Sequence, residues 1–123
     1  MKVFVSGSRS VSLLPEGARA SLARIVELGY TVLVGDCYGV DAAVQRWLAE
    51  HGYTNVVVYH VGKVRNNAGF ETKRVAGGYV DKDIAMSKAC DYGMVVWDGH
   101  SKGTLSNVRR LKHLGKAVKS YLL

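Results

Sequence analysis

The chain has 123 residues, 48% of them hydrophobic and only one a proline, and it carries a formal net charge of +7. This length allows a single domain with a hydrophobic core, residues 1–123, and the composition excludes a disordered or fibrous chain. No apolar run is long enough to cross a bilayer and no leader precedes the first strand, so we expect a cytoplasmic protein without a membrane partner.

Expected strands and helices alternate along the chain. In chain order they are strand 2–6, helix 14–28, strand 30–34, helix 40–51, strand 55–59, helix 80–89, strand 94–97, helix 104–114 and strand 117–122. Such alternation predicts parallel pairing through right-handed crossovers. We therefore expect a three-layer α/β domain, with helices on both faces of a sheet of about five strands and the first strand in a central position.

The segment from Gly62 to Gly78 shows no periodicity and is expected to be a long loop. Its basic residues are Lys63, Arg65, Lys73 and Arg74. Loops of this length in a compact domain usually have a function, so the segment is interpreted as a flap over an anionic ligand or across a partner subunit.

Three Gly-bearing polar loops follow three of the strands. They are Ser6-Gly-Ser-Arg-Ser10, Gly35-Asp-Cys-Tyr-Gly-Val-Asp41 and Asp98-Gly-His-Ser-Lys-Gly-Thr104. Ligands of parallel α/β sheets bind at the carboxyl ends of the strands, where these loops would meet. The third loop opens a helix, and the free N–H groups at a helix start attract an anion.

The other two loops leave alternatives open. Arg9 suits bidentate binding of a phosphate, but a tight turn with a surface arginine has the same sequence. Asp41, in the first turn of its helix, suits a capping role, and Asp36 suits binding of ribose hydroxyls. The two cysteines and four histidines lack the spacing of a disulfide scaffold or a metal site, so we expect no metal and no cofactor.

Four motifs in this order resemble the SLOG superfamily of Rossmann-like domains. They are Ser6-Gly-Ser-Arg9, Gly35 to Ala42, Lys82-Asp-Ile-Ala-Met86 and Asp91 to Thr104. The superfamily includes the LOG phosphoribohydrolases and the DNA-processing Smf/DprA proteins, and the chain is most similar to the small stand-alone YspA-related branch. The resemblance covers the chain except residues 62–78 and implies a nucleotide or other phosphorylated ligand and a homodimer or higher oligomer.

The resemblance also implies which residues bind the ligand. They are Gly7, Ser8, Arg9, Gly35, Asp36, Gly39, Val40, Asp41, Lys82, Ser101, Lys102, Gly103, Thr104 and Asn107. LOG enzymes cleave an N-glycosidic bond with a glutamate and an Arg-Lys pair, and this chain has Asn107 in place of the glutamate and Lys82-Asp83 in place of the pair. A neutral amide cannot replace a carboxylate in that reaction.

The candidate replacement carboxylates are Asp36, Asp83 and Asp98. The first hypothesis is therefore a nucleotide-binding domain that acts as a sensor or a weak nucleotide-processing protein. The alternatives are an N-glycosidase or deoxyribosyltransferase on nucleosides or their monophosphates, and a Smf-like nucleic-acid-binding module. The positive charge is scattered along the chain and has few interleaved aromatic residues, which ranks nucleic acid last among these.

Overall fold

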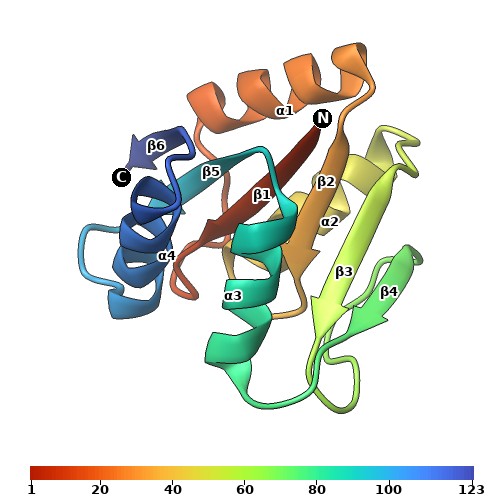
Figure 1. Ribbon diagram of the computed structural model, residues 1–123. Helices are drawn as coiled ribbons and strands as arrows, with labels where there is room; N and C mark the ends of the chain where they lie inside the picture. Colours follow the sequence, from red (N-terminus) through yellow and green to blue (C-terminus); the bar gives the residue numbers. More distant parts are fainter.

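The computed structural model describes residues 1–123 as a three-layer α/β domain with a Rossmann-like fold (Figure 1). The strands are β1 (Lys2–Gly7), β2 (Thr31–Gly35), β3 (Val56–His60), β4 (Glu71–Arg74), β5 (Tyr92–Trp97) and β6 (Val118–Leu122). The helices are α1 (Glu16–Leu28), α2 (Val40–Glu50), α3 (Tyr79–Ala89) and α4 (Lys102–His113). All neighbouring strands are parallel, in the order β4-β3-β2-β1-β5-β6.

The alternation of side chains along the strands builds one core on each face of the sheet. Val3 and Val5 of β1 belong to a cluster that includes Leu22 of α1 and Leu48 of α2. Phe4 lies in the second cluster, with residues of α3 and α4. Because successive side chains of a strand point to opposite faces, a continuous apolar strand needs helices on both sides, and this sheet has them.

The strand order reverses at β1, and this reversal positions the site. The chain moves from β1 through β2 and β3 to β4 in one direction, then returns to place β5 and β6 on the other side of β1. The crossovers that leave β1 and β5 therefore diverge, and a crevice opens between the carboxyl ends of these two strands. Open α/β sheets bind their ligands at such a switch point.

The predicted three-layer α/β fold is confirmed, with six strands where about five were expected, but the loop predicted from Gly62 to Gly78 is wrong at one point. Residues Glu71–Arg74 form a sixth strand, β4, which pairs with β3 at the edge of the sheet. All four side chains of β4 are exposed, so its sequence has no alternation of apolar and polar residues. Backbone hydrogen bonds to β3 hold the strand in place, and these bonds do not require any particular side-chain pattern.

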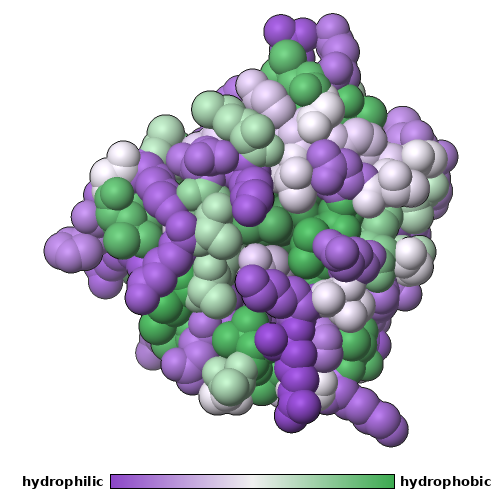
Figure 2. Space-filling view, turned by 45° about the vertical axis from the view of Figure 1, so that its right-hand side comes forward, coloured by the Kyte–Doolittle hydropathy of each residue, from purple (hydrophilic) through white to green (hydrophobic).

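The face of the sheet near β4 is only partly covered. A shallow hollow of about 350 Å³ has Leu33, Val57 and Tyr59 in its floor and Glu71 and Lys73 at its rim. Figure 2, in which this side of the molecule comes forward, shows apolar patches interspersed with hydrophilic side chains. No helix of the structure is both long and apolar enough to cross a membrane.

Candidate functional site

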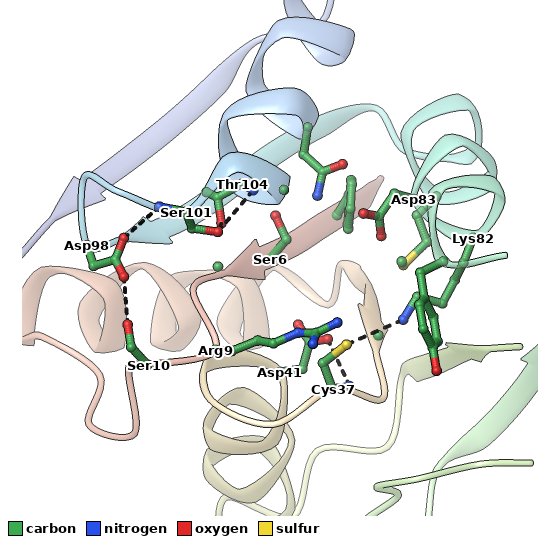
Figure 3. A pocket seen from close by; sticks show the side chains of 17 residues that line it. Ser6, Arg9, Ser10, Cys37, Asp41, Lys82, Asp83, Asp98, Ser101 and Thr104 are labelled. Carbon is green, nitrogen blue, oxygen red and sulfur yellow. Dashed lines mark hydrogen bonds between the residues drawn. The ribbon is translucent and has the colours of Figure 1, made fainter.

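A cavity of about 370 Å³ opens at the carboxyl end of the sheet, between the loops after β1, β2 and β5 and the helices α3 and α4 (Figure 3). It is lined by Phe4, Ser6, Gly7, Arg9, Ser10, Gly35, Cys37, Asp41, Tyr79, Lys82, Asp83, Met86, Asp98, Ser101, Gly103, Thr104 and Asn107. Most of these residues are polar, and both signs of charge are present. The volume is within the range of small-molecule sites.

One wall of the cavity is the start of α4. Ser101 is the N-cap residue, and its Oγ accepts hydrogen bonds from the Thr104 backbone N–H at 3.4 Å and from the Thr104 hydroxyl at 3.1 Å. The backbone N–H of Gly103, in the first turn, has no intrahelical acceptor. A Cβ built on Gly103 would meet no protein atom within 4 Å, so the helix presents bare backbone at this point.

Asp98 holds the loop before α4 in shape. Its carboxylate accepts hydrogen bonds from the backbone N–H groups of His100 at 2.8 Å and Ser101 at 3.0 Å, and from the Ser10 hydroxyl at 2.6 Å. These hydrogen bonds, the one from Ser10 first, hold the pKa of Asp98 well below its usual range. The carboxylate is therefore ionised and occupied by hydrogen bonds within the loop, which argues against Asp98 as a general acid or base.

Ser6 provides the deepest unpaired polar group of the site. The side chain is at the end of β1, 7% exposed, and its Oγ makes no hydrogen bond within the protein. In Figure 3 the hydroxyl faces the cavity beneath the start of α4. A buried polar group without a partner costs free energy, so a hydroxyl in this position calls for a ligand atom to complete it.

Of the two cations that line the cavity, Arg9 and Lys82, Arg9 is the one without an ion pair. Its side chain is exposed and makes no ion pair, and Figure 3 shows it extending along the opening. Gly7 allows this loop to lie against the neighbouring strand, because a Cβ there would collide with the Val96 carbonyl oxygen and with Val40. The guanidinium is therefore free to bind an anion in the cavity.

Asp36 lies beneath the opposite wall and is fully paired. Its carboxylate is 0% exposed and binds the Arg65 side chain at 2.9 Å, the Arg65 backbone N–H at 2.9 Å and the Lys82 Nζ at 3.3 Å. Burial by itself raises the pKa of Asp36, but the hydrogen bonds of Arg65 and the charge of Lys82 outweigh it and bring the pKa to about 2. Asp36 is thus a permanent anion that fixes the buried Lys82.

Asp41 lines the cavity and is almost unpaired. The residue is 8% exposed, its Oδ2 accepts one hydrogen bond from the Cys37 backbone N–H at 3.2 Å, and it makes no ion pair. Burial raises its pKa to about 7, and the charge of Lys82 opposes this rise only in part. At neutral pH this carboxyl group is therefore close to half protonated, which is the condition that favours proton transfer.

Asp83 and Asn107 lie next to each other on α3 and α4. Burial raises the pKa of Asp83, while the charge of Lys82 and a hydrogen bond from Asn107 lower it. The Asn107 Oδ1 accepts a hydrogen bond from the Arg110 guanidinium at 2.7 Å, which fixes the orientation of the amide. Its Nδ2 is therefore left to donate toward Asp83 and the cavity.

The remaining contacts join the long loop to the cavity. Arg65 donates to the Cys37 sulfur at 3.0 Å, and its guanidinium stacks over the Tyr79 ring, 4.5 Å from the centroid. The Lys82 Nζ is 5.6 Å from the same centroid. Tyr79 together with Phe4 and Met86 gives the cavity an apolar side.

The structure brings most of the predicted site residues together. Those that line the cavity are Gly7, Arg9, Gly35, Asp41, Lys82, Asp83, Asp98, Ser101, Gly103, Thr104 and Asn107. Those that do not are Ser8, Asp36, Gly39, Val40 and Lys102. Asp36 and Lys82 form an ion pair across the wall of the cavity: the carboxylate lies beneath the wall, and the lysine borders the cavity.

The residues outside the cavity have structural contacts. The Ser8 hydroxyl accepts from the Asp98 backbone N–H at 3.1 Å, and the Ser8 carbonyl accepts from the Val40 N–H at 3.2 Å. Gly39 has φ +73°, and a Cβ there would lie 2.5 Å from the backbone oxygens of Ser8 and Arg9. These residues hold the loops after β1, β2 and β5 together.

Sequence reasoning did not assign ligand contacts to several lining residues. They are Phe4, Ser10, Cys37, Tyr79 and Met86. Phe4 and Met86 follow the apolar period of their elements, so their sequence pattern indicates only core. Tyr79 at the first turn of α3 carries no motif, and only the path of the chain after β4 brings it to the cavity.

The fold and the cavity define a class: a single parallel α/β domain whose polar site lies at the switch point of the sheet. No group of three or more His, Cys, Asp or Glu residues is arranged to hold a metal ion. The sequence matches no protein-family model and no curated protein. The SLOG resemblance and the homodimer therefore stay predictions.

Proposed function

We propose that this protein binds a nucleotide or a related phosphoribosyl compound in the cavity, with the phosphate at the start of α4. The observation that carries the proposal is the Ser6 hydroxyl, which is buried, unpaired and directed into the cavity below that helix start. A helix N-terminus, a free hydroxyl and the unpaired Arg9 together supply donors and positive charge for a phosphate.

The other end of the cavity suits a sugar and a base. Asp41 and Asp83 offer carboxyl oxygens that no cation occupies, and carboxylates are usual acceptors for ribose hydroxyls. Tyr79, Phe4 and Met86 supply apolar and aromatic surface that a base can pack against. A phosphate, a diol and a flat ring would thus each meet groups of matching chemistry.

Ligand binding is tested by calorimetry with a matched set of compounds. We expect AMP or another nucleoside monophosphate to bind more tightly than the corresponding nucleoside, and ribose 5-phosphate to bind more tightly than ribose. Loss of the phosphate should cost tenfold or more, since charge-assisted hydrogen bonds contribute about 1.5–3 kcal/mol each. Equal affinity for nucleoside and nucleotide would contradict the proposed phosphate position.

Gly103→Val tests the position of the phosphate directly. The new side chain would meet no protein atom, so it should block the approach of a ligand to the backbone while costing under about 1 kcal/mol in helix propensity. Ser106→Val, at an exposed position of the same helix, is the matched control. We expect Gly103→Val to lose nucleotide binding and Ser106→Val to keep it, at equal thermal stability.

A second function, cleavage of the N-glycosidic bond of the ligand, is favoured by one specific observation. Asp41 and Asp83 both line the cavity, and burial raises the pKa of each carboxyl group, that of Asp41 to about 7, so Asp41 supplies protonated acid near neutral pH. Such a group can protonate a leaving base. The test is release of free base from nucleoside monophosphates, which Asp83→Asn should slow. No release above the uncatalysed rate would exclude this function.

A further inference from the structure

The cavity combines two requirements that oppose each other. Its unpaired donors, the Ser6 hydroxyl beneath the start of α4 and the Arg9 guanidinium, favour an anion. Its α2 and α3 side carries the carboxyl groups of Asp41 and Asp83 (Figure 3). An anion that enters this cavity places a third negative charge near two carboxyl groups, of which Asp41 is buried and Asp83 half-buried. Like charges gathered in one cavity cannot all stay ionised at low cost.

The cations near the pair do not remove this conflict. Lys82 is the cation closest to both carboxyl groups, but its Nζ is bound to Asp36 at 3.3 Å and contacts the Cys37 sulfur at 3.8 Å. Asp41 and Asp83 make no ion pair at all. The charge of Lys82 is thus already balanced by a carboxylate beneath the wall.

The charged and titratable groups that face the pair come from every surrounding element. The loops after β1, β2 and β5 contribute Arg9, then Asp36 and Cys37, and then Asp98, respectively. The long loop contributes Arg65, helix α3 contributes Tyr79 and Lys82, and helix α4 contributes Arg110. Arg65 is paired with Asp36. Arg9 is the one cation without a protein partner, and a bound anion would use it.

We propose that the cavity takes up one proton when it binds an anionic ligand, and that the Asp41–Asp83 carboxyl pair receives it. The inference rests on the proposed function, because it needs an anion at the α4 side. In the free protein at pH 8 the Asp41 carboxyl group is mainly ionised. In the complex the Asp41–Asp83 pair carries a proton taken from solvent, so the added charge of the ligand is reduced by one. Affinity for the anion then falls as pH rises.

The properties of Asp41 set the pH range of this coupling. Burial, and to a smaller extent the charges of Asp83 and Asp36, raises the pKa of Asp41 to about 7 in the free protein. Below about pH 6 the pair already holds most of its proton, and affinity should change little with pH. Above pH 7 the ligand has to bring the proton in, and affinity should fall by up to about tenfold per pH unit until the pKa of the complex is passed.

Sulfate is the probe for the experiment because its own charge is constant between pH 6 and 9. Sulfate binding is measured by calorimetry across this range at fixed ionic strength. At pH 8 it is repeated in two buffers that differ in ionisation enthalpy, which gives the number of protons taken up. We expect the dissociation constant to rise about tenfold from pH 6.5 to 8.5, with an uptake between half and one proton per sulfate at pH 8.

Variants assign the proton to the carboxyl pair. Asp41→Asn resembles the protonated acid, so at pH 8.5 it should bind sulfate about as tightly as the unmodified protein does at pH 6.5, without proton uptake. Asp83→Asn should reduce the uptake as well, and it provides a second route if Asp41→Asn does not fold. Glu50→Gln, an exposed change on α2, should keep the full pH dependence.

The two proposals fail in different ways. Sulfate binding that is tight but independent of pH, with no proton uptake, would overturn the coupling and leave the anion site intact. Retention of the pH dependence in both Asp41→Asn and Asp83→Asn would also overturn the assignment. No sulfate binding at any pH would contradict the anion site, and with it both the proposed function and the coupling.

Discussion

Asp36 and Asp41 belong to the same short segment that leads from β2 into α2, and both are buried, yet they have opposite properties. Asp36 has the Arg65 and Lys82 side chains and the Arg65 backbone N–H around its carboxylate, and its pKa is about 2. Asp41 has one backbone N–H and no ion pair, and its pKa is about 7.

The comparison shows that burial alone does not decide what a carboxyl group does. Burial raises the pKa of both residues, and the number of charged donors around each carboxylate determines whether its net pKa is raised or lowered. Asp36 therefore stabilises the wall of the cavity as a permanent anion. Asp41 borders the cavity as a group that changes protonation near neutral pH, which makes it the more reactive of the two.

The largest expected effect comes from Asp36→Asn. This change leaves the buried Lys82 without its anion and leaves Arg65 with one neutral acceptor in place of two carboxylate oxygens, and breaking a buried pair costs about 3–5 kcal/mol. Urea denaturation at pH 7 should show the loss as a lower midpoint. A change of less than 1 kcal/mol would mean that Lys82 transfers its contact to Asp41, and the two aspartates would then be interchangeable.

Asp41→Asn should have the opposite sign and depend on pH. The native carboxyl group has a raised pKa of about 7, so the folded state binds more protons than the unfolded state between about pH 4 and 7, and the group makes stability fall as pH rises through that window. The variant should equal the unmodified protein at pH 4 and exceed it by about 2–4 kcal/mol at pH 8. Denaturation midpoints across this range provide the measurement; a constant difference would contradict it.

Arg65 contributes most to the low pKa of Asp36 and so to the difference in pKa between the two aspartates. Its side chain is 26% exposed. Arg65→Met should cost about 1–2 kcal/mol, less than Asp36→Asn, because Lys82 still balances the Asp36 charge. The pKa of Asp36 should rise toward that of an ordinary aspartate, and NMR titration of the carboxyl carbon would detect this. Arg65→Lys keeps the charge and loses the two-pronged guanidinium geometry, so its stability should lie between that of the unmodified protein and that of Arg65→Met.

Cys37→Ser is expected to have the smallest effect. The sulfur receives contacts from Arg65 and Lys82, but both cations are already held by Asp36. A hydroxyl can accept the same hydrogen bonds, so the free energy of unfolding should change by less than about 1 kcal/mol. A larger loss in thermal denaturation would show that the sulfur itself helps to hold the Arg65 side chain.

Sequence patterns predicted five of the six strands and missed the edge strand β4. The strand at Lys2–Gly7 was recognisable as a short apolar run, and the helix at Glu16–Leu28 was recognisable because its apolar residues repeat with the helical period. The strand at Glu71–Arg74 was not, because no face of it is buried. An edge strand that depends on backbone pairing has no hydrophobic pattern by which it can be found.

The sequence by itself determined the class of fold, the three loops at one end of the sheet and the helix start that faces them, because period, glycine and helix-start signals are local. Only the tertiary structure decided which aspartate is neutralised, since Asp36 meets Arg65 from the long loop and Lys82 from α3. It also decided that Ser6 is left without a partner. Pairing, burial and the resulting pKa depend on residues far apart in the chain, and no local pattern records them.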